Sequence, residues 1–344
     1  MSESGAGLTG HDSLPGDQAA ERPAVRVRGL VKRFGDVEAV RGIDLDVAPG
    51  ETFGFLGPNG AGKSTTINIL CTLAEATSGT AEVAGLDVVK DRAAVRRRIG
   101  LVFQEPTLDN YLSGEQNLRF HGELYGVDRT TAAARREQVL KMVGLWERRK
   151  DEVNKYSGGM RRRLEIARGL LHSPSVLFLD EPTIGLDPQT RKSIWAYLSE
   201  LHRTEKTTVF VTTHYMDEAE NCDRIAIMNE GRIVALDTPD NLKAGVGKDR
   251  VQITTADDAE ALARLRERFG LEAAVHEHLV TVSVPDGAGF VPRLFTELGV
   301  EIRSVTVQRP TLDDVFLAHT GSTIRDAEAG AGPSAFAMMA RRGR

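Results

Sequence analysis

The segment from Gly57 to Thr65 has the residue types and spacing of a phosphate-binding loop. It reads GPNGAGKST and satisfies the pattern GxxxxGK[ST] between a strand-like run and a helical pattern. Glycines let main-chain N–H groups turn toward phosphate oxygens, and the N-terminus of the following helix favours negative charge. We expect Lys63 to neutralise phosphate charge and Ser64 to ligate Mg²⁺. The residues predicted to bind nucleotide are Gly57, Pro58, Asn59, Gly60, Ala61, Gly62, Lys63, Ser64 and Thr65.

Two carboxylates, Asp180 and Glu181, follow the apolar run 176–179. In an open α/β sheet, ligands bind at the carboxyl ends of the strands. We expect Asp180 to hold the metal and Glu181 to polarise the water that attacks a phosphate. A strand that ends in Asp-Glu is a weak sign by itself. Beside a phosphate loop, it indicates an enzyme that hydrolyses nucleoside triphosphates.

A second anion site is predicted at Ser157, Gly158 and Gly159, which precede a helical pattern at 161–171. The serine is placed to cap this helix, and the two glycines expose main-chain N–H groups. The same helix carries three arginines at 161–163 opposite an apolar face. We interpret these arginines as a solvated cationic surface rather than a nucleic-acid patch.

Two further polar residues end predicted strands. Gln104 follows the strand predicted at 99–103, within reach of the metal or the water. His214 follows the strand predicted at 208–213, at the same sheet edge as Asp180. A single histidine at a strand end is usually structural, so the residues alone leave its role open.

Short apolar runs alternate with helical patterns through much of the chain. Runs of this length, separated by helices, are typical of buried strands in a largely parallel sheet. Residues 110–172 interrupt the alternation with helical patterns and no clear strand, so we predict a helical subdomain at about 105–172. The predicted strands are 24–30, 43–47, 52–56, 99–103, 176–179, 208–212 and 224–228.

The composition shifts near 243–250, which predicts a linker and a separate unit beyond it. The following elements read β-α-β-β-α-β, which favours a small ferredoxin-like α+β domain at 250–320. His276 and His278 alternate on one predicted strand, and we expect solvent exposure rather than a metal site. The segments 1–23 and 321–344 lack periodicity and are predicted to be disordered tails.

Composition excludes several other classes of protein. The formal net charge of -5, from 44 basic and 49 acidic residues, argues against non-specific nucleic-acid binding. Cys71 and Cys222 are too far apart in sequence for a Cys-based zinc motif, and a disulfide framework is not expected. No apolar run approaches the ~20 residues that span a bilayer, and no secretory signal is visible. We therefore expect a soluble intracellular protein.

Over residues 24–243, the order of these motifs resembles that of an ATP-binding cassette (ABC) ATPase. The resemblance implies a RecA-like P-loop NTPase fold that binds ATP and Mg²⁺ and hydrolyses ATP. It implies catalytic roles for Lys63, Gln104, Glu181 and His214, and metal binding by Ser64, Gln104 and Asp180. It further implies that Phe34 stacks on adenine, that His214 contacts the γ-phosphate, and that the loop ending at Asp187 faces a partner subunit.

The resemblance also implies a homodimer in which two chains pack head to tail. Each chain would then present Ser157, Gly158 and Gly159 to the ATP of its partner. In this family, the signature segment around these three residues usually begins with Leu and ends with Gln. This chain has Tyr156 and Met160 at those two positions. The effect of these two residues on the hydrolysis rate is left open.

Three segments are similar to the daunorubicin/doxorubicin-resistance type of ABC ATP-binding protein, and so is the C-terminal extension. They are 104–109, 156–164 and 309–317. This similarity implies a bacterial exporter of hydrophobic drugs or antibiotics, in which the ATPase works with a separate membrane permease at the cytoplasmic face. An importer ATPase is the alternative. A soluble ABC ATPase of translation or DNA repair is disfavoured by the single, uninterrupted cassette. The C-terminal domain is interpreted as a dimer-stabilising or regulatory module.

Overall fold

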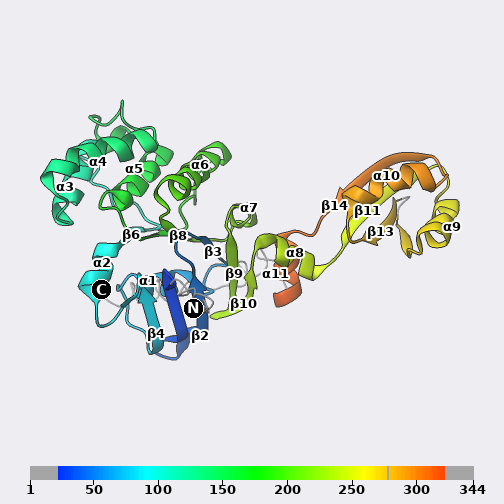
Figure 1. Cartoon of the computed structure of the whole chain (residues 1–344), viewed down its shortest axis with the longest axis horizontal. Coiled ribbons are helices and arrows are strands. Elements are labelled where there is room, and N and C mark those ends of the chain that lie inside the picture. Colours follow the sequence, from blue (N-terminus) through cyan, green and yellow to red (C-terminus); the bar gives the residue numbers. More distant parts are fainter. Residues whose placement is uncertain (1–21, 277–278, 322–344) are drawn as a thin grey trace, which may run out of the picture.

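The computed structural model describes residues 22–276 and 279–321 and shows two parts set side by side (Figure 1). The larger part contains the first ten strands, and the smaller part contains β11 to β14. Most of both predicted tails, together with His278 and the side chain of His276, lies outside the described residues. Among the helices of the described ranges, none has the length and apolarity needed to cross a bilayer.

A six-stranded sheet in the order β10-β9-β3-β8-β7-β6 forms the centre of the larger part. The five strands from β9 to β6 pair in parallel, and β10 pairs with β9 antiparallel at one edge. The predicted largely parallel sheet is thereby confirmed. Its strands are β3 (Thr52–Leu56), β6 (Ile99–Val102), β7 (Val176–Asp180), β8 (Thr208–Thr213), β9 (Arg224–Asn229) and β10 (Arg232–Asp237).

The central strands are buried on both faces because alternate side chains enter two different cores. Leu177 and Leu179 of β7 pack with the helices of one face, in a cluster that includes Leu164 and Leu198. Phe178 packs on the other face with the phosphate-loop helix and a second sheet. This double burial explains why these strands read as continuous apolar runs.

A separate antiparallel sheet, in the order β2-β1-β4-β5, covers that second face. The runs 24–30 and 43–47, predicted as strands, lie within β1 and β2, which pair with each other in this sheet. β4 and β5 were not predicted, since β4 begins with three exposed small residues that carry no apolar signal. The strands are β1 (Val25–Phe34), β2 (Val37–Val47), β4 (Ser78–Val83) and β5 (Leu86–Asp87).

The helices of the larger part lie on either side of the central sheet (Figure 1). Residues 105–172, all of them described, contain helices and no strand, with one isolated bridge between Ser113 and Glu152. The helices there are α3 (Gly114–Leu124), α4 (Arg129–Met142), the 3-10 turn η1 (Val153–Lys155) and α5 (Gly158–Leu170). The others are α1 (Lys63–Leu70), α2 (Arg92–Arg98), α6 (Pro188–Glu205) and α7 (Met216–Ala219).

The smaller part is a four-stranded antiparallel sheet, in the order β12-β13-β11-β14, with two helices packed on it. Its element order, β-α-β-β-α-β, is the order predicted from the sequence. Val251 and Ile253 of β11 face Leu265 and Leu294 in a small core of their own. The elements are β11 (Asp249–Thr255), α9 (Asp258–Phe269), β12 (Ala273–His276), β13 (Leu279–Val284), α10 (Gly287–Glu297) and β14 (Ile302–Gln308).

The chain leaves the larger part through α8 (Pro239–Val246) and returns to it through α11 (Leu312–Thr320), which lies against α8 (Figure 1). Leu312, Val315 and Phe316 of α11 are almost fully buried and belong to the core of the larger part. The β11–β14 unit is therefore attached to the larger part at both of its ends.

Candidate active site

The phosphate loop lies between β3 and α1, as the strand–loop–helix pattern requires. Gly62 has φ +108, and a Cβ at this position would stand 2.4 Å from the carbonyl oxygen of Ala39. A Cβ at Gly57 would stand 2.2 Å from the carbonyl oxygen of Met228. Only glycine fits at either position, so the close packing of the loop against β2 and β9 sets the shape of the phosphate cradle.

Lys63 begins α1 with its ammonium group turned back into the loop. Nζ donates to the carbonyl oxygens of Gly57 at 2.6 Å and Pro58 at 3.0 Å. It also lies 3.4 Å from Oε1 of Glu181. The side chain is 4% exposed, so this cation lies in a nearly dry site between the loop and the end of β7.

Asp180, the last residue of β7, gathers two hydroxyl groups around one carboxylate oxygen. Oδ1 accepts hydrogen bonds from Ser64 Oγ at 3.1 Å and from Thr212 Oγ1 at 2.6 Å. Burial raises the pKa of Asp180, and both hydroxyl bonds oppose that rise. The pairing of Ser64 with Asp180 brings together the two oxygen groups that were predicted to hold the metal.

Glu181 follows directly and lies between two basic side chains. Its Oε1 faces Lys63, and its Oε2 stands 3.3 Å from Nδ1 of His214. Burial pushes the pKa of Glu181 upward, but His214 and Lys63 outweigh it and hold the pKa below its ordinary value. The carboxylate is therefore ionised at neutral pH and able to accept a proton.

Residues of this site offer groups that suit a nucleotide with its metal ion. Glu181 Oε2 and His214 Nδ1 are buried and face each other at 3.3 Å, and neither atom makes a hydrogen bond of good geometry, so both can still bind a ligand. The Ser64 hydroxyl and the Asp180 carboxylate are hard oxygen donors of the kind that Mg²⁺ prefers. A Cβ at Gly60 would meet nothing within 4 Å, so the loop is open on that side.

The Ser157–Gly159 segment caps α5 at an exposed place. Ser157 Oγ accepts from the Met160 N–H at 3.2 Å, as an N-cap does, and both Ser157 and Gly158 are exposed. Beneath them Tyr156 is 3% exposed, and its hydroxyl donates to the Arg148 carbonyl at 2.7 Å. A bulky residue at this position is therefore accommodated inside the helical subdomain, away from the exposed N–H groups.

Asp187 caps α6 next to that segment. Its Oδ1 accepts from the Thr190 N–H at 3.0 Å and its Oδ2 from the Thr190 hydroxyl at 2.6 Å. Thr190 in turn packs on Gly159, where a Cβ would stand 2.5 Å from its methyl carbon. The two segments that were predicted to face a partner chain thus adjoin each other.

Phe34 and Gln104 lie at the ends of strands. Phe34 ends β1 and is half-buried, and the Lys32 ammonium lies 4.7 Å from the centroid of its ring. Gln104 lies two residues beyond β6 and is exposed. Neither side chain is among the partners described above for Lys63, Asp180 and Glu181.

Three residues around the cluster were missed or misjudged from the sequence. Arg162, interpreted above as part of a solvated surface, is buried at 7% exposure. Glu218 is buried and accepts from the hydroxyls of Thr183 and, at 2.8 Å, Thr213. Thr212 bonds Asp180 and was not singled out. The one sequence feature that could have indicated that Glu218 lies near the site is its position four residues after His214, on the short helix α7.

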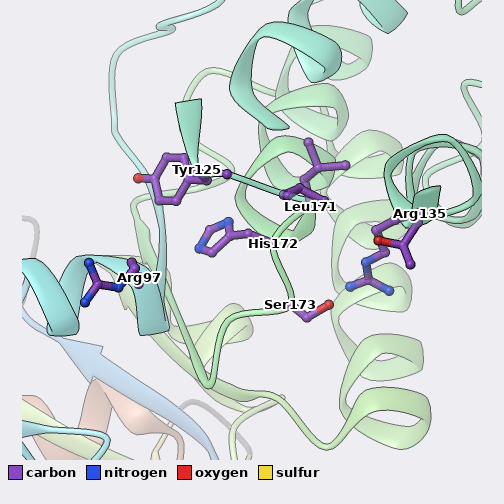
Figure 2. Close-up of a pocket in the computed structure, with 9 residues that line it drawn as sticks. Arg97, Tyr125, Arg135, Leu171, His172 and Ser173 are labelled. Atoms are coloured by element: carbon purple, nitrogen blue, oxygen red, sulfur yellow. The ribbon is translucent and has the colours of Figure 1, made fainter. Parts of the chain in front are cut away.

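A separate hollow of about 390 Å³ lies at the other end of the helical subdomain (Figure 2). Tyr125 stacks on His172 there, with ring centroids 4.3 Å apart, and Arg135 lines one wall. None of its lining residues belongs to the phosphate loop or to the end of β7.

The fold and the site define an ATP-binding cassette of the ABC class. The family model of the ABC transporter matches residues 40–184. One similar solved structure is the ATP-binding cassette MJ0796, in a dimeric post-hydrolysis state bound to ADP and Pi. It superposes with a TM-score of 0.57 at 27% identity, and the match covers 62% of this chain and 98% of that chain. CbiO1 from Clostridium perfringens, part of the ABC transporter complex cbiONQ, gives a TM-score of 0.61 at 27% identity, covering 73% and 97%.

The particular family follows from closer relatives. The chain is 42% identical over 312 residues to the daunorubicin resistance ATP-binding protein DrrA3 of Streptomyces coeruleorubidus, covering 89% of this chain and 98% of that protein. It is 37% identical to the linearmycin resistance ATP-binding protein LnrL of Bacillus subtilis, covering 88% and 100%. A family model for the C-terminal domain of DrrA1-3-like ATP-binding proteins matches residues 238–320. The chain belongs to the DrrA-type family of ABC ATPases, which confirms the resemblance drawn from the segments 104–109, 156–164 and 309–317.

Proposed function

We propose that this chain is the ATP-hydrolysing, energy-coupling subunit of an exporter for hydrophobic drugs or antibiotics. One observation carries the proposal: relatives that match almost the whole chain, C-terminal domain included, are drug-resistance ATP-binding proteins. Importer subunits and soluble ABC ATPases share the cassette, so the cassette alone supports ATP hydrolysis and not the direction of transport.

Within the site we assign roles by contact and charge. The loop from Gly57 to Thr65 binds the phosphates, with Lys63 as the cation among them. Ser64, Asp180 and Gln104 would together hold Mg²⁺. When bound, this ion supplies positive charge against the phosphate oxygens. Phe34 is assigned to the adenine ring.

Glu181 is proposed as the general base. A water attacks the γ-phosphorus, the bond from that phosphorus to the β-bridging oxygen breaks, and the water's proton passes to the Glu181 carboxylate. The products are ADP and inorganic phosphate. His214, whose ring nitrogen lies 3.3 Å from the same carboxylate, is assigned to the γ-phosphate and orients the base.

We further propose that two chains pair head to tail around two ATP molecules. The exposed N-terminus of α5 at Ser157–Gly159 would meet the γ-phosphate bound by the partner, because unpaired N–H groups there suit an anion. Asp187 adjoins this segment and would face the partner chain. An equal pairing of this kind produces two equivalent sites.

The helical subdomain is proposed to receive a membrane permease at the cytoplasmic face of the membrane. The segment 110–116 would lie at this contact, and Tyr111 within it is 85% exposed. The C-terminal unit is proposed to stabilise the dimer or to regulate it.

The proposal is tested by isolating the tagged full-length chain from its native membranes in mild detergent and identifying what accompanies it. A stoichiometric polytopic protein is expected, and a strain without the ATPase should accumulate a fluorescent hydrophobic drug such as an anthracycline. Accompanying ribosomal or DNA-repair proteins would contradict transport. A permease without any change in drug accumulation would favour import.

A further inference from the structure

Arg162 of α5 is buried, and its guanidinium group converges on the main chain that carries Glu181. Nε donates to the carbonyl oxygen of Pro182 at 2.6 Å. Nη2 donates to the carbonyl oxygens of Asp180 at 3.1 Å and Glu181 at 3.2 Å. One side chain therefore binds three consecutive carbonyl groups at the end of β7.

The same guanidinium also reaches the segment after β6. Nη1 donates to the Phe103 carbonyl oxygen and, at 3.1 Å, to Oε2 of Glu165. Glu165 is 1% exposed, and its Oε1 accepts from the Thr107 N–H at 2.7 Å. Arg162 and Glu165 thus join α5 to the chain on both sides of Gln104 and to the end of β7.

The backbone of Glu181 needs such support. Its φ of +46 lies in the left-handed region, which is costly for a residue with a Cβ. A strained conformation of this kind persists at a functional site only when the surroundings over-determine it. The Thr212 hydroxyl accepts from the Glu181 N–H at 3.0 Å, and Arg162 binds the carbonyl groups on either side.

A purely structural ion pair is the competing explanation. Buried ion pairs contribute little net stability, because desolvation offsets the attraction between the charges. The ion pair with Glu165 uses only one of the donors of Arg162. The other N–H groups of Arg162 bind the main chain of residues 180–182, and the position of this main chain sets where the Glu181 carboxylate points.

We propose that Arg162 is a positioning residue for the Glu181 base, acting from the helix whose N-terminus is the Ser157–Gly159 segment. A displacement of α5 at its exposed end would then move the base of the same chain's own site. The inference rests on the proposed role of Glu181, and the experiment below separates the two.

Three forms of the full-length chain are compared first: wild type, Arg162→Lys and Arg135→Lys. Arg135 is a matched control, because it is 13% exposed, pairs with Glu205 and donates to the Leu170 carbonyl at 2.9 Å, at the other end of α5. Lysine keeps the charge but lacks the planar set of donors. Steady-state ATP hydrolysis, binding of a fluorescent ATP analogue and the thermal midpoint are measured for each.

For Arg162→Lys we expect kcat to fall about tenfold or more while the Kd for the ATP analogue stays within about twofold. Arg135→Lys should keep kcat within about twofold, even where its thermal midpoint drops. A wild-type kcat in Arg162→Lys, or an equal fall in both variants, would overturn the inference. Arg162→Gln is measured alongside and decides the question if the lysine variant does not fold.

A double-mutant cycle with Glu181→Gln provides the readout that a structural role would not produce. If Arg162 acts through the base, adding Arg162→Lys to the Glu181→Gln variant should lower its residual rate of ATP hydrolysis by less than about twofold. A further tenfold loss would show that Arg162 acts by another route. Wild-type hydrolysis in Glu181→Gln itself would instead refute the assignment of the base.

Discussion

At the scale of single residues, Lys63 illustrates how the site is prepared for an anion. Its ammonium binds two loop carbonyls and faces the Glu181 carboxylate in a nearly dry site. An incoming phosphate is a stronger partner for this cation than a neutral carbonyl oxygen, because the phosphate carries negative charge.

Lys63→Ala is expected to remove ATP hydrolysis, with a rate loss of at least about 100-fold, because it deletes the cation that faces the transferred phosphate. Phosphate release from purified protein measures the effect. Lys90→Ala is the control, since the Lys90 side chain is 82% exposed and pairs with nearby Asp87. Activity within a few-fold of wild type in Lys63→Ala would show that the loop does not bind the reacting phosphates.

Glu181→Gln is expected to retain ATP binding, to lose hydrolysis by about 100-fold or more and to accumulate an ATP-dependent dimer. The amide keeps the shape of the side chain but cannot take the proton of the attacking water. Size-exclusion chromatography with and without ATP, together with phosphate release, checks both expectations. A variant that hydrolyses ATP normally, or that stays monomeric with ATP, would contradict the base or the dimer respectively.

The approach of Ser64, Asp180 and Glu181 to one another is predictable, because parallel strands bring their carboxyl ends to one edge of the sheet. The role of Arg162 is not predictable in this way. Three arginines in a row look alike in the sequence, and only the packing of α5 against the end of β7 decides that the middle one is buried.

At the scale of elements, the helical subdomain contains an aromatic cluster with a partly buried histidine, His121. His121 on α3 packs on Tyr125, with ring centroids 4.5 Å apart. Burial, together with repulsion by Arg168 and His172, lowers the pKa of His121 to about 4 from 6.5. The unfolded chain binds this proton more readily, so the contribution of His121 to folding stability is complete above pH 6.5 and is lost as the pH drops toward 4.

His121→Phe should therefore reduce the loss of stability between pH 6.5 and 4 by about 2 kcal/mol, allowing for partial exposure. Phenylalanine keeps the ring contact with Tyr125 but cannot be protonated. Urea denaturation at a series of pH values measures the effect, with His319→Phe as an exposed control. A variant whose stability falls with acid as steeply as that of wild type would show that His121 is not the group responsible.

The antiparallel sheet shows where element prediction reaches its limit. Periodicity identified β1 and β2 as strands, yet nothing local states that they pair with each other rather than with β3. Pairing is set by the long-range burial of Val25 and Leu45 against the phosphate-loop side of the main sheet. The β-α-β-β-α-β order of the smaller part was predictable, because each of its elements has a clear local period.

At the scale of the whole molecule, α11 joins the last described residues of the chain to the core of the cassette. Phe316→Ala is expected to lower the free energy of unfolding by about 3–4 kcal/mol, because it opens a cavity beneath a fully buried ring. Denaturant unfolding measures the loss. Leu317→Ala, at a neighbouring residue that is 44% exposed, should cost less than about 1 kcal/mol. Equal effects of the two substitutions would mean that α11 does not pack as described.

The double attachment of the β11–β14 unit bears on any attempt to remove it. A chain cut off before β11 would also lose α11, and the vacated surface of α8 and β10 would lower stability whatever the unit does. Because α8 and α11 lie against each other and β11 pairs with β14, we expect that residues 249–308 can be excised and replaced by a short glycine-rich turn. The unit's contribution to ATP turnover is thus separable from its contribution to folding, provided that the last helix stays in place.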